Sequence, residues 1–208
     1  MIKNIILIII STLLCSCSIN RHLEDNTYIL KKNTVTLDNS TNQSISITKK
    51  EINDIIKQKP NKRITGLIPF HLWIYTLSNP TKNNWINNYL RKIGEAPVVL
   101  EEKLTQKSRL QIKSYFENNG YFTSTIKDTV IYKNKKAYVH YHIKTGDLYF
   151  IKNINYLKAN NTPIKKLIQL NSKYSKIHSG DIFTYTALNN ERIRIESLLQ
   201  NNSASLLW

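Results

Sequence analysis

The sequence predicts an α+β protein with an export signal, a strand-helix-helix-strand-strand unit and a second, incomplete copy of that unit. Three observations predict this organisation. An almost unbroken apolar run at 5–14 follows a single lysine at position 3. A long helical pattern at 101–119 precedes two alternating segments, 122–132 and 136–144. A similar helical pattern then returns 83 residues further along the chain.

The N-terminal segment, residues 1–16, is predicted to be a secretory signal peptide. Its ten apolar positions would span about 15 Å as a helix, too short to cross a hydrocarbon core of about 30 Å. Leu14-Cys15-Ser16-Cys17 resembles the lipobox of bacterial lipoproteins, with an aliphatic residue at −3 and a small one at −1. We therefore predict cleavage before Cys17 and acylation of that cysteine. An ordinary signal peptide with two incidental cysteines is the alternative.

A polar stretch, residues 17–27, would then tether the folded part to the membrane through the lipid. The chain has two cysteines, and cleavage would remove Cys15, so we predict no disulfide. The formal net charge of +16 permits attraction to anionic lipid or saccharide, but its lysines are scattered along the chain. Because an exported protein does not meet nucleic acid, we predict no nucleic-acid partner.

The first folded unit is predicted over residues 28–146. β-Forming residues indicate a strand at 34–38, ending in a turn. Thr48 and Glu51 have the spacing of a capping box, which predicts a helix over about 48–58 that stops before Pro60.

An apolar cluster broken by prolines occupies residues 63–97, and we predict a helical insertion there. A surface that packs on a partner is the alternative reading. The strong helical pattern at 101–119 ends at Gly120, as expected for a glycine just after a helix. In the second of the following strands, alternation predicts that Tyr138, His140 and His142 share one face and that the other face comprises Ala137, Val139, Tyr141 and Ile143.

The second unit is predicted over residues 147–208, with a strand at about 148–157 and helices at 163–170 and about 184–201. The repeat is most visible between SRLQIKSYFENN and ERIRIESLLQNN. Because a strand is also predicted before each of these helices, a repeated supersecondary unit explains the match better than chance does.

A helix ending in Asn-Asn-Gly-Tyr-Phe, a hairpin, and a new segment KTGDLYFIKNINY at 144–156 together resemble the POTRA repeat of the BamA/TamA family. The lipidation motif makes the likeness closest to the TamL-like lipoprotein branch. The resemblance implies a lipid-anchored outer-membrane protein whose soluble part is periplasmic. It also implies that unfolded or partly folded outer-membrane proteins are the clients, with other assembly-machinery subunits as possible partners.

In this family the device for binding a client is an exposed sheet edge. The resemblance places that edge at the first strand of the hairpin, and the candidate client-binding residues are Phe122, Ser124, Ile126, Asp128 and Val130. The chain departs from the family because no closing hairpin and no β-barrel follow the second unit. We therefore expect a truncated fragment of a longer protein.

The sequence contains no constellation of residues that predicts catalysis or a cofactor. His140 and His142 share a strand face, but no third ligand recurs at metal-binding spacing, so no metal site is predicted. Two function classes remain, a POTRA-type binding module or a structural surface lipoprotein, which includes a non-functional fragment without clients.

Overall fold

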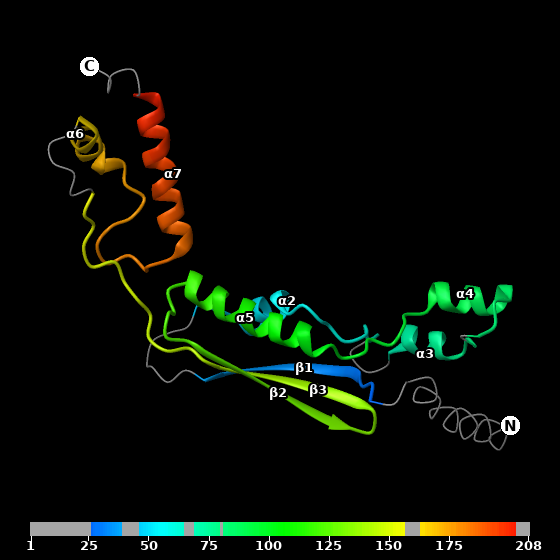
Figure 1. The fold of residues 1–208 in the computed structure, drawn as a ribbon. Coiled ribbons are helices and arrows are strands. Elements are labelled where there is room, and N and C mark those ends of the chain that lie inside the picture. The colour runs from blue at the N-terminus through cyan, green and yellow to red at the C-terminus, as the bar shows by residue number, and fades with distance from the viewer. Residues whose placement is uncertain (1–25, 39–45, 65–68, 80, 157–162, 203–208) are drawn as a thin grey trace, which may run out of the picture. The chain divides into compact units, whose positions relative to one another are not determined.

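The computed structural model describes residues 26–38, 46–64, 69–79, 81–156 and 163–202. The predicted signal peptide, the lipidation site Cys17 and most of the tether lie outside the described residues. The described part contains a three-stranded sheet and six α-helices, which confirms the predicted α+β class (Figure 1). Within these residues, no helix has both the length and the apolar character needed to cross a membrane.

The sheet has the order β1-β3-β2, formed by β1 (Ile29–Asp38), β2 (Thr125–Lys133) and β3 (Lys136–Lys144). β1 and β3 run parallel, because hydrogen bonds join their beginnings, Ile29 N to Lys135 O at 3.0 Å, and their ends, Thr145 N to Asp38 O at 3.2 Å. β2 and β3 form a hairpin around Asn134 and Lys135. Both residues have positive φ, 50° and 57°, as in a type I′ turn, which matches the twist of paired strands.

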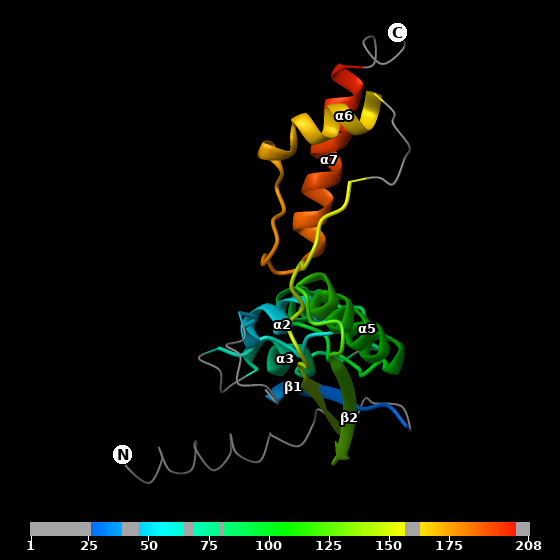
Figure 2. The same cartoon turned by 90° about the vertical axis from the view of Figure 1, so that its left-hand side faces the viewer.

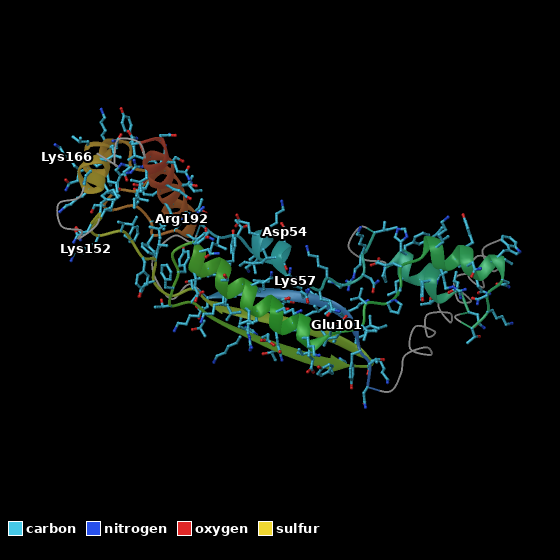
Figure 3. The ribbon with its side chains drawn as sticks, turned by 45° about the horizontal axis from the view of Figure 1, so that its top comes forward. Asp54, Lys57, Glu101, Lys152, Lys166 and Arg192 are labelled. Carbon is cyan, nitrogen blue, oxygen red and sulfur yellow. The ribbon has the colours of Figure 1, made fainter. Side chains whose placement is uncertain are left out.

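Helices α2 (Lys49–Ile55) and α5 (Glu102–Asn118) lie on one face of this sheet (Figures 1 and 2). The predicted capping box starts α2: Thr48 N donates to Glu51 Oε2 at 2.7 Å, and Glu51 N donates to Thr48 Oγ1 at 3.3 Å. α2 is shorter than the predicted 48–58. Figure 3 labels Lys57, just beyond α2, and Glu101, just before α5.

The core lies between the helices and the sheet. On β3 the buried and less buried residues alternate as predicted, with Ala137, Val139, Tyr141 and Ile143 on the buried face. α5 contributes three fully buried residues at helical spacing, Ser108, Ile112 and Phe116. Gly120 ends the helix with a φ of 91°.

Two helices, α3 (Phe70–Thr76) and α4 (Trp85–Ile93), lie within the segment that was predicted to be a helical insertion. They contact each other. The N-cap of α4 is Asn84, whose side chain accepts a hydrogen bond from Asn87 N at 3.1 Å.

The C-terminal part contains α6 (Pro163–Leu170), a short 3-10 helix, Ser172–Tyr174, and α7 (Tyr185–Asn201). The predicted strand at 148–157 is wrong. Among the described residues that segment has one isolated bridge, Phe150 to Ile182, and its backbone pairing with residues 180–183 is limited to residues 149–151.

The described residues divide into two compact units, whose boundaries fall after residues 36, 52, 108, 127 and 141.

Candidate functional site

The two outer strands of the sheet differ in how their free edges are covered. The edge of β1 is occupied at its beginning: Leu30 N donates to Val98 O at 2.8 Å, and Leu100 N donates to Tyr28 O at 2.7 Å. A guanidinium N–H of Arg63 also donates to Lys31 O at 2.8 Å. β2, in contrast, has only β3 as a strand neighbour in the described part of the chain. The open edge is therefore that of β2.

The two-residue hairpin fixes which backbone groups of β2 face outward. In such a hairpin the residues that flank the loop, Lys133 and Lys136, form a hydrogen-bonded pair, and every second residue back along the strand pairs in the same way. Thr129 and Ile131 therefore bond to β3. By the same alternation, the N–H and C=O groups of Ile126 and Val130 face away from β3, toward the open edge.

The predicted client-binding residues differ in their location relative to β2 and in their burial. β2 begins at Thr125, so Phe122 and Ser124 precede the strand, and the predicted strand start at 122 is wrong. Ser124 is buried and Phe122 is exposed. Ile126 is buried and Asp128 and Val130 are half-buried, so these three side chains lie on the core side of β2. Only their backbone groups remain to contact an added strand.

The end of β2 is held at Tyr132. Its hydroxyl donates to Glu102 Oε1 at 3.1 Å, and its ring lies 4.4 Å from that of Tyr28, measured between centroids. Burial, followed by the hydrogen bond to Glu102, raises the pKa of Tyr132. The phenol therefore stays protonated and keeps donating at neutral pH.

Phe122 belongs instead to an aromatic cluster that the sequence patterns did not indicate. Its ring centroid lies 5.4 Å from that of Tyr149 and 5.4 Å from that of Phe183. Tyr149 N donates to Gly120 O at 3.0 Å and Phe183 N donates to Tyr149 O at 2.9 Å, so backbone bonds fix the cluster. It forms one wall of a shallow groove. Its geometry is that of a packed aromatic contact.

A second groove is cationic. Lys31, Lys32, Lys59 and Arg63 line it together with one carboxylate, Asp54, and several amide side chains. Burial, then the nearby charges of Arg63 and Lys136, lowers the pKa of Lys31. Lys31 is thus close enough to Arg63 and Lys136 for their charges to disfavour its own, and the four cations of the groove outnumber its one carboxylate.

The histidines of β3 do not form a metal centre with their neighbours. His140 is half-buried and His142 is exposed. In the part of the chain that the structure covers, no group of three or more His, Cys, Asp or Glu residues could hold a metal ion.

Comparisons with known proteins find similar solved structures. No family model and no curated protein matches the sequence. The structure is similar to the crystal structure of POTRA domains 3 to 5 of BamA from Haemophilus influenzae, with a TM-score of 0.42 and 15% sequence identity. The similarity covers 86% of this chain and 57% of that one, so this chain spans little more than half of that structure's length.

Proposed function

We propose that this chain is a non-catalytic binding module of the bacterial cell envelope that receives extended segments of outer-membrane proteins at the edge of β2. The observation that carries the proposal is the difference between the two sheet edges. Val98, Leu100 and Arg63 occupy the edge of β1, whereas β3 is the one strand neighbour of β2 among the described residues. An added strand would complete the unpaired hydrogen bonds of β2.

Binding of this kind selects backbone shape more than side-chain identity. The core-facing side chains of β2 are covered, and the exposed ones include Thr125, Lys127, Thr129 and Ile131. A client strand that alternates apolar and polar residues fits beside this face, and its acidic residues would meet Lys127. We therefore expect weak binding that tolerates many sequences.

The test is amide hydrogen exchange followed by NMR, on residues 17–208 carrying Cys17→Ser so that no lipid is attached. In the free protein, the amides of Thr129 and Ile131 should exchange slowly because they bond to β3. That of Val130 should exchange fast. Adding a peptide with the alternating sequence of a barrel C-terminal strand should slow exchange at Val130.

A matched pair of variants separates the contribution of the backbone N–H to peptide binding from that of the side chain. Val130→Pro removes the outward N–H, and Val130→Ala removes most of the side chain but keeps the N–H. With unchanged circular dichroism, Val130→Pro should weaken peptide binding about fivefold, the effect of a hydrogen bond worth ~1 kcal/mol, and Val130→Ala should not. Shifts limited to lysine side chains and abolished by salt would show plain electrostatic attraction, and edge pairing would be dropped.

We also propose that Cys17 carries the lipid that holds this module at the outer membrane, with its folded part in the periplasm. The support is the spacing of Leu14, Ser16 and Cys17 after an apolar run. Radiolabelled fatty acid should enter the protein and be lost in Cys17→Ala but not in Cys15→Ser. Label lost only in Cys15→Ser would move the site to Cys15.

A further inference from the structure

Helix α4 of the helical insertion exposes its apolar side and buries a polar residue. On α4, four apolar side chains are exposed: Trp85 by 78%, Tyr89 by 59%, Ile86 by 48% and Ile93 by 39%. At 100° per residue they fall within one contiguous stripe. The residue that α4 buries is polar, Asn87, which is 8% exposed. An amphipathic helix ordinarily packs with its apolar stripe inward, so the outward stripe of α4 needs a partner.

The polar side of α4 explains how this orientation is held. Asn79 N donates to Asn87 Oδ1 at 2.6 Å. Arg91 donates to Asn79 O at 2.7 Å and to Lys82 O at 3.1 Å. Since Asn87 and Arg91 hold the connection between α3 and α4, the polar face is fixed inward and the apolar face is left to solvent.

α3 adds a second exposed apolar stripe. Phe70 is 41% exposed, Trp73 44% and Leu77 51%, and the spacing of three and four places them on one side of the helix. With α4, this hairpin of residues 70–93 presents two tryptophans and a tyrosine, side chains that favour the boundary between lipid and water.

Charge indicates which partner covers these stripes. From Pro60 to Gly94 the sequence has no acidic residue, while it has five cations, Lys62, Arg63, Lys82, Arg91 and Lys92. At the base of the hairpin, Lys31, Arg63 and Lys136 line a groove that also includes Pro69 and Leu72 of the α3 region. Glu95 follows this segment and its carboxylate accepts from Lys62 N at 3.2 Å, so the segment still has an excess of cations. Exposed aromatic and aliphatic residues bordered by such an excess are complementary to an anionic bilayer surface.

We propose that the α3–α4 hairpin is a membrane-contact element that inserts its aromatic stripes into the interface of an anionic phospholipid bilayer. This proposal does not depend on edge pairing at β2. It would hold the module against the membrane surface independently of the acyl chain, and the two contacts together would bind more firmly than one.

The test uses residues 17–208 with Cys17→Ser, which removes the lipid, and Trp208→Phe, which leaves Trp73 and Trp85 as the two tryptophans. The protein is mixed with vesicles of phosphatidylcholine, with or without about 30% phosphatidylglycerol. We expect sedimentation with the anionic vesicles and a blue shift of tryptophan emission. Quenching by lipids brominated on the acyl chain would place the rings in the interface.

Variants test whether the stripes carry the binding. Trp85→Ser combined with Tyr89→Ser should lower the partition coefficient about tenfold. The control is Leu110→Ser with Tyr185→Ser, since each of these residues is 61% exposed but lies on α5 or α7. It should bind like the parent, and all variants should keep the parent circular dichroism.

Three results would overturn the proposal. The first is an absence of vesicle binding. The second is binding without a tryptophan shift, insensitive to Trp85→Ser with Tyr89→Ser and abolished by salt, which would be simple attraction to a basic chain. The third is a dimer in lipid-free solution, seen by analytical ultracentrifugation and lost in that variant, which would make a second copy the occupant.

Discussion

Ser108 and Glu191 lie 83 residues apart, at the same position of two 17-residue helices, and each accepts a hydrogen bond from the backbone N–H of a lysine. Lys57 N donates to Ser108 Oγ at 3.0 Å, and Lys176 N donates to Glu191 Oε2 at 2.8 Å. Both lysines follow the preceding helix of their own unit. In each repeat, a buried polar residue of the second helix therefore holds the segment that follows the first helix.

Ser108→Ala should destabilise the protein. The hydroxyl is fully buried, donates to Leu104 O at 2.7 Å and accepts from Lys57 N. Alanine would leave the N–H of Lys57 without this acceptor, at a cost of about 1 to 3 kcal/mol. Urea unfolding should show this loss of stability. Ser114→Ala, on the exposed side of the same helix, is the control and should be near neutral; equal effects of the two would contradict the role of Ser108.

Lys135→Gly should stabilise the hairpin. Lys135 has a φ of 57°, a left-handed conformation that costs a residue with a Cβ about 1 kcal/mol and costs glycine little. Its backbone carbonyl, which accepts from Ile29 N, is kept. We expect a gain of about 0.5 to 1 kcal/mol by thermal unfolding. Lys133→Gly, one position before the turn on β2, should lower stability instead; a loss in both variants would refute the turn assignment.

Gly120→Ala and Gly180→Ala form a matched pair. Both glycines have positive φ, 91° and 93°, so alanine strains the backbone equally. A Cβ at Gly120 would lie 3.0 Å from Ile182 Cγ2 and 3.2 Å from the backbone oxygen of Phe183, whereas one at Gly180 would meet nothing within 4 Å. Gly120→Ala should therefore cost about 1 kcal/mol more than Gly180→Ala in chemical unfolding. Equal losses of stability would mean that the side chains and backbone around Gly120 adjust to the added methyl group at no cost.

Local signals predicted the elements whose causes are local. The helices α5 and α7 were visible from periodicity, and the repeat of 83 residues matches their observed bounds, Glu102–Asn118 and Tyr185–Asn201. The Thr48–Glu51 capping box forms as its spacing predicts. The strand predicted at 148–157 failed because alternation describes a side-chain pattern, while a strand also requires continuous backbone pairing, and here the pairing is limited to residues 149–151.

The candidate site was less predictable because burial depends on tertiary contacts. The pattern located the hairpin, but the covering of β1 by Val98 and Leu100 comes from a distant segment. That covering is what leaves β2 as the open edge. The amphipathic pattern of α4 was likewise present in the sequence, but nothing local indicates that Asn87, not Trp85, faces inward.

The buried carboxylate of Glu191 gives the C-terminal unit a pH dependence. The residue is 3% exposed. Burial raises its pKa, but hydrogen bonds from Arg194, Lys176 N and the Tyr156 hydroxyl together outweigh burial and bring the pKa down to about 2. The Arg194 contact is 2.7 Å and the Tyr156 contact 2.7 Å.

Stability from this lowered pKa should be fully present above about pH 4.5, the ordinary value of the carboxyl group, and be lost as the pH falls toward about 2. A shift of this size corresponds to about 3 kcal/mol as an upper bound. Glu191→Gln should therefore be less stable at pH 7 and lose less stability than the parent between these two pH values, because its side chain has no charge to lose. Glu196→Gln is the control: its partner is Arg192, the carboxylate side chain is 54% exposed, and an exposed pair contributes little. Urea unfolding at a series of pH values, followed by circular dichroism, gives the comparison; an acid-induced loss in Glu191→Gln as large as in the parent would show that another group controls it.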